Sequence, residues 1–194
     1  MNILVCIKQV PDTTEIKIDP VTNTLIRAGV PSIVNPFDAY ALEIAARIKD
    51  VTPETKIILL SMGPKQAEAA LKECLAVGGD KAYLVSDRAF GGADTLATSY
   101  ALATAIRKIG NCDIIIGGRQ AIDGDTAQVG PQVAEKLGLT QITYAEEILE
   151  VGKDKITVKR HIDGGVETVE GPLPIVITVN GSAAPCRPRN AKPV

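Results

Sequence analysis

The residues best suited to bind a ligand lie in a glycine-rich stretch, residues 117–130. This stretch follows the apolar run 114–116, which is typical of a buried parallel strand. Apolar residues at helical spacing come next and predict a helix that begins at Asp125 or Thr126. They are Val129, Val133 and Leu137. Because glycines admit a ligand close to the backbone and a helix start offers unpaired N–H groups, the stretch is either a phosphate cradle or an ordinary strand–loop–helix turn.

Three other loops are expected at the same edge of the sheet, at residues 6–12, 61–64 and 90–95. Ligands of open α/β sheets bind at the carboxyl ends of the strands, which is where these loops begin. Three of the four loops place a glycine next to a helix start, and this favours a nucleotide site over a purely structural role. Neither the Walker lysine pattern nor the GxGxxG spacing is present. Arg119 either neutralises phosphate charge or lies at the surface.

The polar side chains of these loops suit a nucleotide better than a metal ion. The hydroxyl groups of Thr95 and Thr126 can bond phosphate directly. Asp94, Asp123 and Asp125 are expected to cap helices or to accept hydrogen bonds from sugar hydroxyls, because nothing else supplies a full oxygen cage. The sequence therefore predicts a nucleotide or cofactor binder with no metal ligands.

Composition excludes several classes of protein. A net charge of −2 argues against nucleic acid as a partner. The apolar run at the N-terminus is too short for a signal sequence or a membrane span. The single histidine, His161, is expected at a solvated strand position, and with no nucleophile–base pair we expect no catalytic residue. Cys6, Cys74, Cys112 and Cys186 form no C-x-x-C pair and are expected to be buried thiols in a reducing cytoplasm.

The fold class follows from alternating strand and helix patterns. Hydrophobic residues make up 45% of the chain and aromatic residues 3%, a composition typical of parallel sheets covered by helices. Strands are expected at 2–7, 56–61, 82–85 and 113–116. With helices between them, they predict an α/β fold: a three-layer open parallel sheet, Rossmann-like and adenine-nucleotide-binding, with an appended antiparallel β-meander.

Helix starts and faces can be assigned from the sequence. Asn35 is expected to cap a helix whose first residue is Pro36. Pro11 is expected to end the first strand, because proline cannot donate a ladder hydrogen bond. The buried face of the first helix is predicted to carry Ala41, Ile44, Ala45 and Ile48. The helix after the second glycine loop is marked by Leu96, Tyr100, Ala103 and Ile106.

Changes in the pattern of apolar and polar residues divide the chain into three parts. Residues 1–140 are expected to form the α/β nucleotide-binding domain. Residues 141–182 are expected to form the β-meander, whose last run, 175–179, returns to the main sheet. Its other strands are expected at 146–151, 156–160 and 166–170. Residues 183–194 form a tail rich in proline and arginine.

Four blocks, taken together in order and spacing, resemble the β subunit of electron-transfer flavoproteins along nearly the whole chain. They are residues 5–12 (Val-Cys-Ile-Lys-Gln-Val-Pro-Asp), 35–38 (Asn-Pro-Phe-Asp), 61–64 (Ser-Met-Gly-Pro) and 118–130. The hairpin signal Asp163-Gly164-Gly165 agrees with the resemblance. The resemblance implies a heterodimer with an α subunit that holds one FAD, and an adenine nucleotide held by the loops of the β subunit.

The resemblance, combined with the loop patterns, gives a set of expected cofactor-binding residues. They are Cys6, Lys8, Asn35, Pro36, Phe37, Asp38, Met62, Gly63, Phe90, Gly91, Asp94, Thr95, Gly118, Arg119, Gln120, Ala121, Asp123, Gly124, Asp125, Thr126, Ala127, Gln128 and Val129.

Two stretches, 118–131 and 88–95, are similar to those of electron-bifurcating members. In such members the nucleotide is a second FAD, which takes hydride from NADH and sends its two electrons along separate paths. The small residues Gly124 and Ala127 leave room for more than AMP. One alternative is the AMP-binding structural β subunit of a non-bifurcating flavoprotein. A further alternative, from another class, is a stand-alone ATP-binding regulatory domain.

The resemblance also implies partners. The chain would act as a flavin-carrying subunit of an NAD-dependent oxidoreductase complex, with no activity expected of the isolated chain. Expected partners are the α subunit, an acyl-CoA dehydrogenase or another flavin dehydrogenase, and a low-potential acceptor such as ferredoxin. Family members usually continue past Val194 into a recognition segment and a C-terminal arm, so residues 183–194 are expected to begin that segment.

Overall fold

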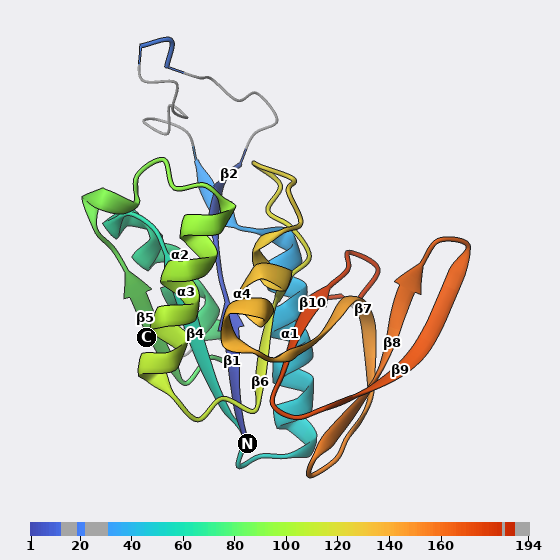
Figure 1. The fold of residues 1–194 in the computed structure, drawn as a ribbon. Coiled ribbons are helices and arrows are strands. Elements are labelled where there is room, and N and C mark those ends of the chain that lie inside the picture. The colour runs from blue at the N-terminus through green and yellow to red at the C-terminus, as the bar shows by residue number, and fades with distance from the viewer. Residues whose placement is uncertain (13–18, 22–30, 184, 189–194) are drawn as a thin grey trace.

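The structure is a computed structural model that describes residues 1–12, 19–21, 31–183 and 185–188. Eight strands in this part of the chain form one sheet in the order β5-β4-β1-β6-β10-β7-β8-β9 (Figure 1). The strands, in that order, are Lys81–Val85, Lys56–Met62, Asn2–Cys6, Ile114–Gly118, Ile175–Val179, Thr140–Val151, Lys155–Ile162 and Gly165–Pro172. The first six are parallel to one another, whereas the β7–β8 and β8–β9 pairs are antiparallel.

Helices cover both faces of the parallel part (Figure 1). They are α1 (Pro36–Val51), α2 (Glu68–Val77), α3 (Thr95–Ile109) and α4 (Val129–Leu137), with short 3₁₀ turns η1 (Lys65–Ala67) and η2 (Arg88–Phe90). Because side chains alternate along a strand, Ile3 and Val5 of β1 pack with α1 and α2, whereas Leu4 packs with α3 and α4. The predicted three-layer α/β class is confirmed, and the buried face expected for α1 is present.

The order of the strands creates a topological switch beside β1. The chain passes from β1 through α1 to β4 and then to β5, and it returns through α3 to β6 on the other side of β1. The loops that leave β1 and β6 therefore diverge at the carboxyl edge of the sheet. This is the position where open α/β sheets bind ligands.

The β-meander continues the main sheet. Strand β7 is parallel to β10 over Thr140–Ile142 and antiparallel to β8 from Ala145 onward. The run 175–179 returns between β6 and β7, as expected. The domain boundaries at 140 and 182 stay a prediction.

Two local expectations were wrong. Residues Gln9–Pro11 form a short strand, β2, paired with Ser32–Val34 (β3), so Pro11 is the last residue of a strand in an isolated two-stranded sheet. Leu96 and Tyr100 of α3 are 61% and 66% exposed, and the buried side of that helix carries Ser99, Leu102, Ala103 and Ile106. The sequence pattern also predicts a long excursion with short extended pieces over 13–34, of which 13–18 and 22–30 lie outside the described residues.

Candidate functional site

The candidate site comprises the carboxyl ends of β1, β4 and β6 and the N-termini of α1, α3 and α4. Cys6, Met62 and Gly118 are the last residues of the three neighbouring strands. Gly117 and Cys6 lie so close that a Cβ on the glycine would come within 3.3 Å of the cysteine Cβ. The structure thus brings together the loops that the sequence pattern assigned to this edge.

Asp38 in the first turn of α1 ties two of these loops together. Its carboxylate accepts the backbone N–H of Lys8 at 2.8 Å and that of Gly118 at 2.9 Å. Burial raises the pKa of Asp38 to about 6, against the lowering effect of these two amide donors. Asp38 therefore fixes the loop after β1 and the end of β6 to the same helix.

Asn35 holds the glycine-rich loop rather than capping its own helix. It occupies the position before Pro36, as expected, but its side chain makes no capping hydrogen bond. The amide nitrogen donates to the carbonyl of Gln120 at 2.8 Å, and the amide oxygen accepts from the N–H of Ile122 at 3.2 Å. The block 35–38 therefore organises the loop 118–122.

The loop leads into a helix that begins later than expected. Helix α4 starts at Val129, not at Asp125 or Thr126, because Asp125 and Ala127 have φ values of 50° and 52°, which a helix cannot contain. Ala127 is followed by Gln128 in a right-handed helical conformation. Such an alternation is typical of backbone nests, in which successive N–H groups converge on an anion. The candidate cradle is thus an irregular loop joined to a helix N-terminus.

The acids of the loop bind other side chains of the protein and do not act as helix caps, while their expected role toward sugar hydroxyls stays a prediction. Asp123 accepts from the ammonium group of Lys8 at 2.5 Å, and its side chain is only 4% exposed. Asp125 accepts from the side-chain amide of Gln120 at 2.7 Å. Neither caps a helix. Among the described residues no group of three or more His, Cys, Asp or Glu side chains is placed to hold a metal ion.

The second glycine loop meets the first at the N-termini of α3 and α4. Asp94 caps α3 as expected, accepting from the N–H of Ala97 at 2.8 Å. The hydroxyl of Thr95 donates to the side-chain carbonyl of Gln128 at 2.9 Å and accepts from the side-chain amide of Gln132. The backbone of Phe90 makes local hydrogen bonds, donating to the carbonyl of Asp87 and accepting from the N–H of Ala93.

Arg119 lies between two aromatic rings, which the sequence did not indicate. Its guanidinium carbon is 5.0 Å from the ring centre of Phe37 and 5.5 Å from that of Tyr144. One terminal nitrogen donates to the side-chain oxygen of Asn180 at 3.1 Å. The sequence offered one signal for Asn180, since it follows the run 175–179 that was expected to return to the sheet. No signal pointed to Tyr144.

The thiols of the chain differ in environment. Burial, with the neighbouring charge of Asp38, raises the pKa of Cys6 to about 12, so this thiol stays protonated at the candidate site. Cys74 is buried and Cys112 is half-buried. The expectation that all four are buried holds for Cys74 and was wrong for Cys6 and Cys112, which are half-buried by exposure, and for Cys186, which is exposed. All four are free.

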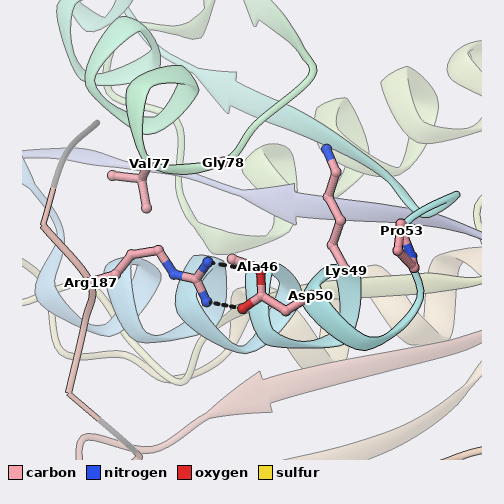
Figure 2. Close-up of a pocket in the computed structure, with 7 residues that line it drawn as sticks. All are labelled: Ala46, Lys49, Asp50, Pro53, Val77, Gly78 and Arg187. Atoms are coloured by element: carbon pink, nitrogen blue, oxygen red, sulfur yellow. Dashed lines mark hydrogen bonds and ion pairs between the residues drawn. The ribbon is translucent and has the colours of Figure 1, made fainter. Parts of the chain in front are cut away.

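A separate cavity of about 390 Å³ lies beside the C-terminal halves of α1 and α2 (Figure 2). Arg187 crosses α1 there and binds Glu43 and Asp50, at 2.9 Å and 2.7 Å for the shortest contacts. Arg47 also donates to Glu43, at 2.7 Å. The opposite charges around this cavity are paired with one another, and the cavity contains none of the expected cofactor-binding residues.

Comparison with known proteins gives the family. Residues 22–194 match the family model described as the electron transfer flavoprotein domain. The chain is 57% identical to the caffeyl-CoA reductase–Etf complex subunit CarD of Acetobacterium woodii and 58% identical to the electron transfer flavoprotein subunit beta of Megasphaera elsdenii, covering 92% of this chain and 68% of each relative. It is 52% identical to protein FixA of Azotobacter vinelandii, covering 92% of this chain and 65% of that relative. The chain therefore belongs to the electron transfer flavoprotein family.

None of the described helices is long and apolar enough to cross a membrane.

Proposed function

We propose that this chain is the β subunit of an electron transfer flavoprotein and that the carboxyl edge of β1, β4 and β6 binds FAD. The observation that carries the proposal is the way α1 organises this edge. Asp38 and Asn35 hold the loops after β1 and β6 from one helix start, at the topological switch of the sheet. A fixed set of backbone donors at this position suits a pyrophosphate.

Each part of a dinucleotide has candidate partners at this edge. The backbone from Thr126 to Val129 would bind the pyrophosphate, because the nest-like turn and the start of α4 present N–H groups there, whereas the N–H of Asp125 already donates to the carbonyl of Ala121. The strand ends at Cys6 and Met62 would bind the adenine through their backbone. The bound FAD would supply hydride and single-electron transfer, while the chain binds and orients it.

Gly124 supports a dinucleotide over a mononucleotide. A Cβ at this position would meet no atom within 4 Å, and its φ lies outside the left-handed region, so the fold itself does not require glycine there. Open space beside the cradle leaves room for a ligand larger than AMP. The finer function is then that of the bifurcating type, with NADH as the donor, and with a dehydrogenase and a low-potential acceptor such as ferredoxin as recipients.

The partner is an electron transfer flavoprotein α subunit. A relative at 57% identity is a subunit of a caffeyl-CoA reductase–Etf complex, which supports assembly of this chain with a flavin-containing reductase. Four free cysteines suit a reducing cytoplasm. The AMP-binding type of β subunit is the competing function.

The nucleotide content of the heterodimer tests the proposal. The chain is co-purified with its α subunit, and the nucleotides are released by heat and separated by chromatography. We expect two FAD per heterodimer. One FAD and one AMP would overturn the assignment of FAD to this chain.

A pair of matched glycine variants tests where in the β subunit FAD binds. Gly124 and Gly165 are both open to solvent, and an added Cβ would meet no atom within 4 Å at either position. Gly124→Val is expected to lose FAD from the β subunit while keeping the melting temperature. Gly165→Val, in the hairpin of the meander, is expected to keep both. Equal FAD content in the two variants would contradict the proposed position.

A further inference from the structure

Arg119 is held more firmly than a surface arginine needs to be. Its backbone N–H extends the β6–β10 ladder by donating to Val179 at 2.9 Å. The residues on either side are fixed from α1, Gly118 by Asp38 and Gln120 by Asn35. The guanidinium also contacts the rings of Phe37 and Tyr144. Both the backbone and the side chain of Arg119 are therefore held by neighbours on other elements.

This arrangement is costly for the fold. Tyr144 adopts a φ of 57°, which is strained for a bulky residue. It lies where the pairing of β7 with β10 shifts register, and its N–H donates to the hydroxyl of Thr178. The Nε–H of Arg119 is buried with no hydrogen-bond partner. Immobilising an arginine also costs side-chain entropy.

No opposite charge in the described chain offsets these unfavourable contributions to stability. Arg119 forms no ion pair with any described carboxylate, and its side chain donates a hydrogen bond to the neutral amide of Asn180. Its neighbour at the edge, Lys8, differs in this respect because it is paired with Asp123. A fixed and uncompensated cation beside an open edge of the sheet suits an anionic ligand.

We propose that Arg119 is a preorganised cation for the negative charge of the bound dinucleotide, and that Tyr144 is a positioning residue that acts through it. This inference rests on the proposed function. The charge belongs either to the pyrophosphate or to the reduced flavin, and both are parts of the same ligand. Strain at Tyr144 aims its ring at the guanidinium and is offset when the ligand binds.

The test measures the dissociation constant of FAD for the β subunit in the heterodimer, by titration after this site has been emptied. Arg119→Gln is expected to weaken FAD binding about tenfold and to flatten its salt dependence. Tyr144→Gly is expected to do the same, because glycine accepts the positive φ without strain while the ring is lost. Tyr144→Phe restores the ring and is expected to bind as the wild type does.

The controls separate positioning from folding. Tyr144→Gly is expected to keep its melting temperature within a few degrees, since relief of strain offsets the lost packing. Tyr100→Ala, on the exposed side of α3, removes a tyrosine away from Arg119 and is expected to change neither quantity. Wild-type affinity for FAD together with an unchanged midpoint potential in Arg119→Gln would overturn the proposal. Wild-type affinity in Tyr144→Gly alone would overturn the role of Tyr144.

Two further measurements show which part of the bound FAD carries the negative charge that Arg119 contacts. If Arg119 acts on the pyrophosphate, ADP binding weakens by the same factor as FAD binding. If it acts on the reduced flavin, ADP binding is unchanged and the midpoint potential of this FAD becomes more negative. A wild-type heterodimer with AMP in place of the second FAD would defeat the proposed function. In that case the role of Arg119 is tested separately. An unchanged affinity for AMP in Arg119→Gln would show that Arg119 does not bind the negative charge of the ligand.

Discussion

Two buried carboxylates on the same helix, α1, have opposite electrostatic surroundings. Asp38, at the candidate site, accepts hydrogen bonds from two neutral backbone N–H groups, and burial raises its pKa to about 6. Glu43, five residues later, is just as buried. Burial would raise the pKa of Glu43 too, but hydrogen bonds from Arg187 and Arg47 outweigh it and lower the pKa below its ordinary value.

The difference shows how one helix can serve two purposes. Amide donors fix the backbone of two loops without neutralising the charge of Asp38, so this end of α1 sets the shape of the candidate site. Charged donors on Glu43 instead attach a distant segment, because Arg187 lies 144 residues away in the sequence. The first end of α1 should therefore control nucleotide binding, and the second should control only the docking of residues 185–188.

The largest effect is expected where α1 approaches β6 most closely. A Cβ on Gly118 would lie 2.7 Å from both the carbonyl carbon of Phe37 and a carboxylate oxygen of Asp38. Gly118→Val should therefore reduce the free energy of unfolding by about 4 kcal/mol, because backbone must move. Urea denaturation measures this loss. Gly124→Ala serves as the control, and an equal loss in both variants would mean that the close approach is not the cause.

Asp38→Asn is expected to have the next largest effect. The asparagine keeps the shape but presents a donor to one of the two N–H groups of Lys8 and Gly118, which is left unpaired. We expect a loss of about 3 kcal/mol in the free energy of unfolding. The FAD content of the heterodimer should fall as well. Full FAD content in a destabilised variant would break the link between Asp38 and the site.

The fold class and the edge of the sheet could be predicted because they depend on local patterns. Apolar runs and helical stripes give the strands and helices, and parallel strands place their carboxyl ends together. The register of the glycine-rich loop could not be predicted in this way. Whether Asp125 and Ala127 adopt positive φ depends on contacts of the whole loop with Asn35, which a stripe of apolar residues does not reveal.

Contacts between distant residues were also beyond the sequence. Asn35 is a good helix cap by type, yet its side chain binds a loop 85 residues away. Nothing in the sequence pointed to the arginine partners of Glu43, which are visible only in the fold. Tyr144 precedes the strand expected at 146–151, and nothing in its sequence neighbourhood gives a sign of a positive φ. Such features depend on tertiary packing and register, which no short window of sequence contains.

Glu43→Gln tests the comparison between the two carboxylates at the other end of α1. The variant weakens the charge-assisted hydrogen bonds from Arg47 and Arg187, whose side chains are 51% and 28% exposed, so solvent reduces the cost. We expect a loss of about 2 kcal/mol in the free energy of unfolding, with unchanged FAD content. Glu68→Gln, which breaks an exposed pair with Lys72, is the control for a lost surface charge. A loss of FAD in Glu43→Gln would show that the two ends are coupled.

The smallest effect is the pH dependence of stability, and its sign distinguishes the two carboxylates. The pKa of Asp38 is raised from 3.8 to about 6, so the folded protein holds this proton more tightly and the contribution of Asp38 falls as pH rises between these values. From pH 5 to pH 6 this amounts to about 1 kcal/mol. The pKa of Glu43 is lowered, so its contribution is present above about pH 4.5 and is lost as pH falls through the lower folded value.

Urea denaturation from pH 4 to pH 7 should therefore show that Asp38→Asn removes a decline in stability toward pH 6, whereas Glu43→Gln removes a decline toward pH 4. Parallel curves for wild type and Asp38→Asn would mean that Asp38 is charged throughout, and that its amide partners stabilise the ion as effectively as the arginines stabilise Glu43.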